Sequence, residues 1–203
     1  MTITVLVGRQ NEGKTLGMTR LILPDFIMGR DIYTNTPFGF PHTLINKDFL
    51  MDMVEKGISL KDITYALDEF WLWIDARRRE TLLSYFYMQS SKDNANLVIT
   101  TQTAKQVDTR LRDALHFYGE CERKILYKGK FYNVPKEFRH LRKELPEELQ
   151  ERLFIHIKMY VPRTSLLRRG IHMDDFKYIG TKVCYAKAYY SVYDTERKIK
   201  IKL

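Results

Sequence analysis

Eight residues near the start of the chain have the types and spacing of a phosphate-binding loop. They are Gly8, Arg9, Gln10, Asn11, Glu12, Gly13, Lys14 and Thr15, and they fit the pattern G-x-x-x-x-G-K-[ST]. The two glycines let the backbone curl so that successive N–H groups face phosphate oxygens, Lys14 reaches the β- and γ-phosphates, and the Thr15 hydroxyl ligates Mg²⁺. The loop therefore predicts a site for a nucleoside triphosphate with Mg²⁺.

Two further stretches end in polar side chains suited to the same chemistry. Residues 63–67 form a short apolar run followed by Asp68 and Glu69, and residues 96–102 form a second run that ends in Gln102. An acid at the end of a buried strand is expected to hold Mg²⁺, and a second carboxylate beside it can polarise a water molecule against the γ-phosphate. A polar residue at the end of the neighbouring strand can sense that phosphate. Kinases do not need the second carboxylate, so Glu69 favours hydrolysis.

The elements that must position these residues alternate between strand and helix. A strand at 3–8 leads into the loop, and a helix from Lys14 to Leu23, stopped at Pro24, places its positive end under the phosphates. A helical pattern at 48–56, ended by Gly57, precedes the second strand. Another helical pattern at 80–92 lies between the second and third strands. Three strands alternating with helices predict an α/β fold with a parallel sheet and right-handed crossovers.

Beyond Gln102 the pattern is looser. One or two strands are expected at 115–127, a charged helix broken by Pro146 at 136–150, and a strand at 152–161, while 174–203 is not assigned. The 203 residues fit one domain, with 121–203 adding peripheral elements.

Composition narrows the class of protein. Hydrophobic residues make up 44% of the chain, which argues against disorder. The net charge of +9 is equally consistent with a polyanionic partner and with an ordinary solvated basic surface. Cys121 and Cys184 are too far apart for a zinc or disulfide motif and are expected to be buried thiols. There is no signal-peptide pattern and no apolar run of membrane-spanning length, so no membrane span is expected.

The order of these motifs, followed by Val107-Asp108-Thr109-Arg110-Leu111-Arg112-Asp113, resembles the FtsK-HerA superfamily of DNA-translocating ATPases. Within it, the chain is most similar to the genome-packaging ATPases of membrane-containing dsDNA viruses, those of the Sulfolobus turreted icosahedral viruses above all. The similarity covers roughly residues 1 to 120. It implies a RecA-like (ASCE) P-loop NTPase fold, in which helices flank both faces of a mostly parallel sheet and a strand is inserted between those carrying the two Walker motifs.

The resemblance also implies a role for each site residue. Lys14 and Thr15 hold phosphate and Mg²⁺, Asp68 is the Walker B acid, Glu69 is the catalytic base and Gln102 is the sensor. An arginine is supplied by a neighbouring subunit, and the candidates are Arg110 and Arg112, with the triplet at 77–79 as an alternative that could also reach DNA.

We therefore expect an ATP-hydrolysing motor that translocates double-stranded DNA, independently of sequence, into a preformed viral capsid. It would work as a homo-oligomeric ring, a pentamer or hexamer, in contact with capsid vertex proteins in the host cytoplasm. Lys124, Lys128 and Lys130 are further candidates for DNA contacts. The alternatives are a small P-loop phosphotransferase, a related motor for phage extrusion or secretion that moves single strands or protein, and a nucleotide-dependent binding module.

Overall fold

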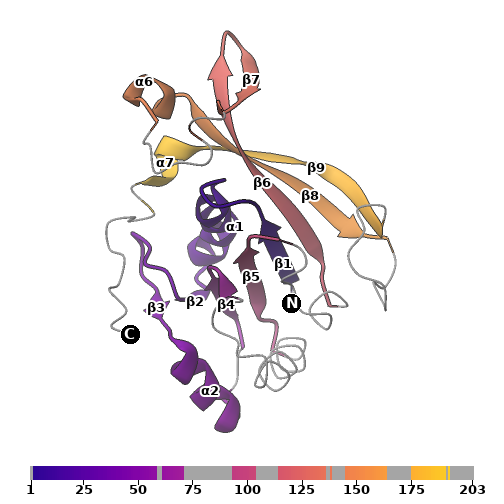
Figure 1. Ribbon diagram of the computed structural model, residues 1–203. Coiled ribbons are helices and arrows are strands. Elements are labelled where there is room, and N and C mark those ends of the chain that lie inside the picture. The colour runs from indigo at the N-terminus through magenta and orange to yellow at the C-terminus, as the bar shows by residue number, and fades with distance from the viewer. Residues whose placement is uncertain are drawn as a thin grey trace.

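The described residues form one mixed sheet with helices packed on it (Figure 1). The computed structural model describes residues 2–58, 61–70, 93–103, 114–135, 138, 145–163, 175–190 and 192. Nine strands are present in these ranges: β1 Thr2–Val7, β2 Asp31–Thr34, β3 Thr43–Leu44, β4 Ile63–Leu67, β5 Asn96–Thr101, β6 Phe117–Tyr127, β7 Lys130–Asn133, β8 Leu153–Pro162 and β9 Phe176–Tyr185. The helices there are α1 Lys14–Ile27, α2 Lys47–Glu55, α6 Glu147–Gln150 and α7 Ala186–Tyr190.

The sheet has the strand order β3-β2-β4-β5-β1-β6-β8-β9, and β7 pairs with β6. All neighbours from β3 to β6 are parallel, so β5 lies between the loop-bearing β1 and the acid-bearing β4, as expected. Val7 pairs with Thr101, and Leu67 pairs with Ile99. The three predicted site segments therefore leave the sheet at the same carboxyl edge, where ligands of open α/β sheets bind.

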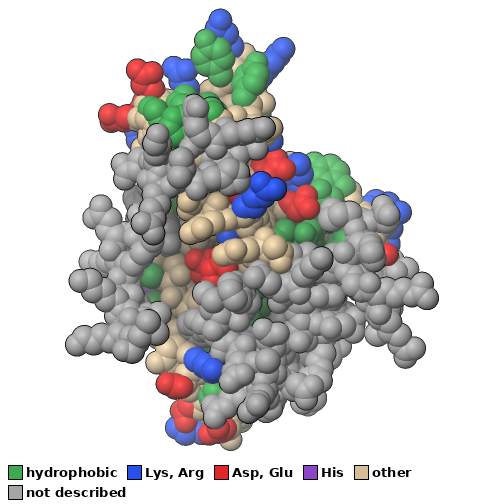
Figure 2. All heavy atoms as spheres, viewed as in Figure 1, with side chains coloured by type: hydrophobic (Ala, Val, Ile, Leu, Met, Phe, Trp, Pro, Cys, Tyr) green, Lys and Arg blue, Asp and Glu red, His purple; other side chains and the backbone are tan. Residues whose placement is uncertain are grey.

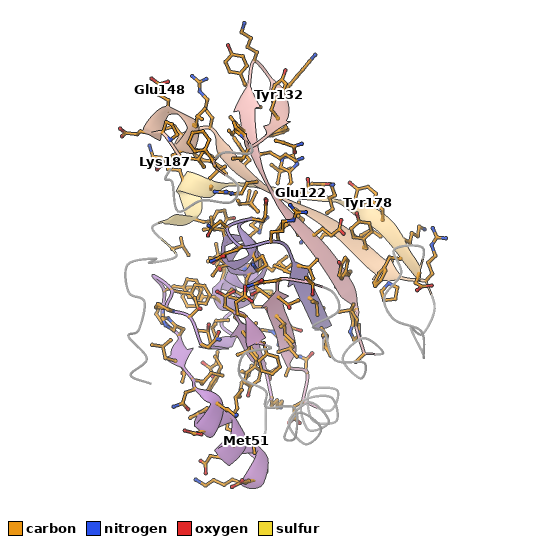
Figure 3. The ribbon with its side chains drawn as sticks, viewed as in Figure 1. Met51, Glu122, Tyr132, Glu148, Tyr178 and Lys187 are labelled. Carbon is orange, nitrogen blue, oxygen red and sulfur yellow. The ribbon has the colours of Figure 1, made fainter. Side chains whose placement is uncertain are left out.

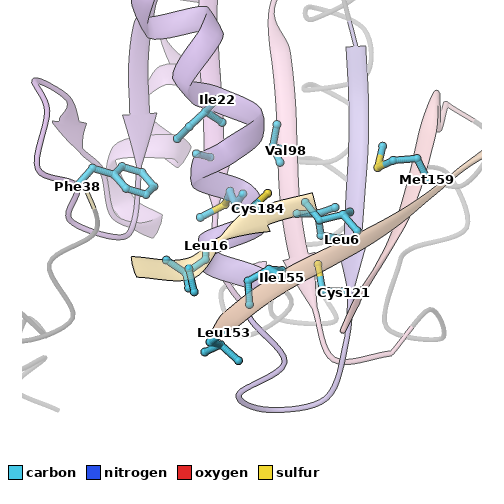
Figure 4. Packing of buried hydrophobic residues seen from close by; sticks show 14 of the residues in the cluster. Leu6, Leu16, Ile22, Phe38, Val98, Cys121, Leu153, Ile155, Met159 and Cys184 are labelled. Carbon is cyan, nitrogen blue, oxygen red and sulfur yellow. The ribbon is translucent and has the colours of Figure 1, made fainter. Parts of the chain in front are cut away.

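Alternation along the central strands creates two cores, one on each face. Ile3, Val5 and Val7 of β1 face a cluster that receives Leu50 and Met53 from α2. Leu6 faces the opposite cluster, which α1 covers with its apolar stripe (Figure 4). Helices therefore flank both faces of the sheet, which confirms the predicted RecA-like architecture.

The second half of the chain extends the sheet with antiparallel strands. Residues 115–127 give the single strand β6, and the expected strand at 152–161 is β8. The unassigned tail supplies β9 and α7. In Figure 1 the long strands β6, β8 and β9 lie beyond β1 on one side of the parallel part, and the β6–β7 hairpin projects from the sheet.

The predicted end of the first helix was wrong. α1 continues through Pro24 to Ile27, and the Met28 N–H donates to the Pro24 carbonyl at 3.0 Å. Proline removes one helical hydrogen bond, but the side chain of Asp25 ties this turn to the sheet by accepting from Thr64 at 2.7 Å and Asn96 at 2.8 Å. These tertiary hydrogen bonds offset the local cost.

The remaining local predictions have mixed outcomes. The helix at 48–56 is α2, and α6 begins directly after Pro146. The helix expected at 80–92 lies outside the described residues, as does most of 136–144. Cys121 and Cys184 are buried free thiols, and burial raises the pKa of Cys121 to about 12. Within the described ranges, none of the helices is both long and apolar enough to cross a membrane.

Asp25→Ala tests the link between α1 and the sheet. The hydroxyl of Thr64, a residue with no exposed surface, would lose its acceptor, so we expect a loss of about 1–3 kcal/mol in the free energy of unfolding. Urea denaturation measures this loss. The control is Asp52→Ala on α2, which removes only an exposed ion pair with Lys56 and should cost about 0.5 kcal/mol or less. Equal losses in the two variants would contradict the assigned role of Asp25.

Candidate active site

The phosphate-binding loop leaves β1 at Val7 and enters α1 at Lys14. Two of its residues, Asn11 at φ 64° and Gly13 at φ 81°, have left-handed backbone conformations. A Cβ at Gly13 would lie 2.3 Å from Cδ1 of Ile155 on β8, so only glycine fits that position. The loop is thus shaped both by its own sequence and by the antiparallel extension behind it.

Lys14 is a buried cation at the centre of the site. Only 6% of its side chain is exposed, and its ammonium group lies 3.1 Å from Oε1 of Glu69. The same group donates to the Arg9 carbonyl at 3.2 Å, so the side chain is folded back over its own loop. The expected phosphate ligand and the expected catalytic base are therefore paired with each other.

The carboxylate of Asp68 is held by two hydroxyl groups. Thr15 donates to its Oδ2 at 3.0 Å, and Thr100 of β5 donates to its Oδ1. Burial is the largest influence and raises the pKa of Asp68, an effect that these hydrogen bonds oppose. Charge repulsion from Glu69 also raises this pKa, and Lys14 lowers it.

The backbone around Asp68 is fixed by residues that the sequence analysis did not single out. Asn35, just after β2, accepts from the Asp68 N–H and donates to the Asp68 carbonyl, both at 2.7 Å. Thr100 accepts from the Glu69 N–H at 2.9 Å, and Glu69 takes a positive φ of 47°. Asn35 and Thr100 lie at or near the carboxyl ends of strands adjacent to β4, and that placement is the signal that could have identified them.

Thr15 and Asp68 fit the expected Mg²⁺ site. Mg²⁺ is held by oxygen atoms, commonly one or two protein ligands completed by phosphates and water. Here a hydroxyl and a carboxylate lie within 3.0 Å of each other beside the loop. In the part of the chain that is described, no cluster of three or more His, Cys, Asp or Glu residues could form a cage for a metal ion. The oxygen atoms of Thr15 and Asp68 therefore suit a Mg²⁺ ion that would be bound together with a nucleotide.

Gln102 lines the same cavity as residues of the phosphate-binding loop. It follows β5 directly, is exposed, and lines a cavity of about 740 Å³ together with Gly8, Arg9 and Glu12. The far wall of the cavity comes from β6 and β8 and includes Lys124 and Lys158. Arg110, Arg112 and the triplet at 77–79 lie outside the described residues, so their predicted roles stay predictions.

Comparison with known proteins agrees with the fold. No protein-family model matches the sequence, and no curated protein does. Among solved structures, the N-terminal domain of zonular occludens toxin from Neisseria meningitidis matches 95% of this chain and 98% of its own, with a TM-score of 0.59 and 15% identity. At that identity the likeness shows a shared fold, which is that of RecA-like P-loop ATPases.

Weaker structural likenesses include a viral packaging protein and an archaeal flagellar protein. The DNA-packaging ATPase B204 of Sulfolobus turreted icosahedral virus has a TM-score of 0.49 at 11% identity, covering 84% of this chain and 98% of that one. The flagellar accessory protein FlaH of Methanocaldococcus jannaschii has a TM-score of 0.45 at 11% identity, covering 90% and 84%.

The raised pKa of Asp68 predicts a pH-dependent effect of Asp68→Asn. A carboxyl group whose pKa is higher in the folded state than in the unfolded chain costs stability once ionised, and this cost is absent below the unfolded pKa of 3.8. Without nucleotide, we expect the Asn variant to melt at a higher temperature than wild type at neutral pH, and the gain to vanish on acidification below that pKa. Thermal melts across a pH series measure the difference. A variant that is less stable at neutral pH would contradict this account.

Proposed function

We propose that this chain binds Mg²⁺–ATP at the phosphate-binding loop and hydrolyses it to ADP and phosphate. The observation that carries the proposal is the pairing of Lys14 with Glu69 at 3.1 Å, directly beside Asp68. It brings a cation for the phosphates, an acid for the metal and a second carboxylate into one cluster. A phosphotransferase needs the first two groups but not the third.

The residues support a sequence of roles. ATP phosphates compete with Glu69 for the ammonium group of Lys14, and the loop N–H groups and the start of α1 favour the negative charge. Glu69 is then released to accept a proton from the attacking water. Thr15 and Asp68 would hold Mg²⁺, which supplies charge neutralisation on the phosphates when bound. In this proposal Gln102 senses the γ-phosphate. The chain assembles into a homo-oligomeric ring, and a neighbouring subunit supplies an arginine to the site, for which Arg110 and Arg112 are the candidates.

We further propose that hydrolysis drives the translocation of double-stranded DNA into a viral capsid. The order of motifs resembling FtsK-HerA ATPases supports this cargo, as does the net charge of +9, because phosphate contacts that ignore base identity suit a motor moving any sequence. In this proposal the ring acts in the host cytoplasm, in contact with the vertex proteins of the capsid.

Glu69→Gln tests the hydrolytic role. The amide keeps the size of the side chain but cannot act as a base, and it no longer holds Lys14 through a full charge. We expect ATP binding equal to or tighter than that of wild type, with turnover reduced by about 100-fold or more. Binding is followed with a fluorescent ATP analogue and turnover by phosphate release.

The matched control for this test is Glu151→Gln. Glu151 is an exposed carboxylate paired with Lys187 at 2.8 Å, and its change should leave turnover intact. Turnover close to wild type in the Glu69 variant would remove Glu69 from the role of base.

Phosphate release with and without DNA tests the cargo. We expect long linear duplex DNA to stimulate release, and the stimulation to weaken as salt is raised, because lysine and arginine contacts with phosphate depend on counterion release. Stimulation by single strands alone would favour extrusion. Phosphate transferred to an acceptor would indicate a phosphotransferase, and nucleotide binding without release would indicate a binding module.

A further inference from the structure

The β6–β7 hairpin projects from the sheet (Figure 3, where Tyr132 is labelled). Its two-residue turn, Lys128 and Gly129, has positive φ at both positions, 46° and 76°, which fixes a tight register. Tyr127 pairs with Lys130, and Ile125 pairs with Tyr132. Paired residues of antiparallel strands share a face, so Tyr127, Lys130 and Tyr132 lie on the same side. We call these three residues the tyrosine face.

The rings of the tyrosine face are open to solvent. Tyr127 is 48% exposed and Tyr132 is 50% exposed. The opposite face of the hairpin differs, because the ring of Phe131 there packs edge-on against Phe154 at 5.3 Å and against His156 at 4.4 Å. Phe131 is itself 43% exposed, but its ring is held by these two ring contacts on the face opposite to the tyrosines.

The hairpin is also basic. No Asp or Glu occurs from Arg123 to Val134. Lys128 lies 5.4 Å and Arg152 lies 5.8 Å from the centre of the Tyr127 ring. Figure 2 shows Lys or Arg and hydrophobic side chains gathered at the projecting end of the molecule, where Figure 1 places β7. Two cations over the half-exposed Tyr127 ring, close to the half-exposed Tyr132, suit a ligand that is both anionic and aromatic.

We propose that the tyrosine face, with Lys128 and Arg152, binds single-stranded DNA. Unpaired bases stack on exposed tyrosine rings, and the adjacent cations pair with the phosphates. In a duplex the base faces are already stacked and cannot reach the rings. For a motor that moves duplex DNA, the unpaired strand would be a frayed end that is engaged before translocation begins. The choice of DNA as the polyanion rests on the proposed function, whereas the binding itself can be measured without ATP hydrolysis.

The test measures binding of a fluorescent oligo-dT strand and of a matched duplex by anisotropy, with the full chain and without nucleotide. We expect Tyr127→Ala combined with Tyr132→Ala to weaken single-strand binding at least about tenfold and to leave duplex binding nearly unchanged. Lys128→Ala combined with Lys130→Ala should weaken both and reduce the salt dependence. Tyr132→Phe, which keeps the ring, should bind the single strand like wild type.

The matched control replaces an exposed lysine and tyrosine elsewhere, Lys177 and Tyr178 on β9, by alanine. Thermal melting, equal to wild type in all these variants, verifies that the chain is folded. Wild-type single-strand binding by the double tyrosine variant, an equal loss in the β9 control, or no binding of the strand to the wild type would each overturn the proposal. Failure of ATP hydrolysis would leave these results intact and would count against the proposed function alone.

Discussion

The ion pair between Lys14 and Glu69 is the interaction on which the rest of the site depends. A lysine with 6% of its side chain exposed needs an anionic partner, since an isolated charge is costly away from water. Glu69 is that partner here, and in the proposed function ATP phosphates would compete with it for Lys14. The residue proposed to activate the attacking water thus compensates the charge of the residue proposed to bind the phosphates. In that proposal, nucleotide binding and release of the base would be one exchange rather than two events.

Asp68, the carboxylate next to Glu69, shows that burying charge in this site costs free energy. Asp68 is buried enough that its pKa is raised despite two hydroxyl donors, and Glu69 adds repulsion from an adjacent backbone with a positive φ of 47°. Strain of this kind persists only where the surroundings over-determine it. Here they do, because Leu67 and Phe70 on either side are buried, and Asn35 and Thr100 hold the intervening backbone by hydrogen bonds. The backbone between Leu67 and Phe70 is therefore held by the surrounding strands, although the two adjacent carboxylates repel each other.

How much could be predicted from the sequence depends on whether a feature is set by local residues or by contacts that form only in the folded chain. The loop, Asp68 and the central strands were predictable because their chemistry or periodicity is local: glycines that curl a loop, apolar runs that end in acids. Asn35 and Thr100 were not, since their roles arise only when β2, β4 and β5 become neighbours. The run of α1 past Pro24 depends likewise on Asp25 reaching Thr64 and Asn96. In β9, Phe176 and Cys184 are buried and most of the residues between them are exposed, so the strand has no repeating pattern to read.

Strand β6 links the phosphate-binding loop with the exposed tyrosines of the hairpin. Near its start it pairs with β1 in parallel, and at Arg123 its N–H donates to Oε2 of Glu12 in the phosphate-binding loop at 3.0 Å. The carbonyl of Cys121 on the same strand approaches Gly8 so closely that a side chain there would meet it at 3.0 Å. Four residues beyond Arg123 the strand reaches Tyr127 and the open face of the hairpin. The loop therefore packs directly against β6 with little free space at Gly8, and the same strand continues into the hairpin. The fold thus connects the phosphate-binding loop and the exposed tyrosines along one strand.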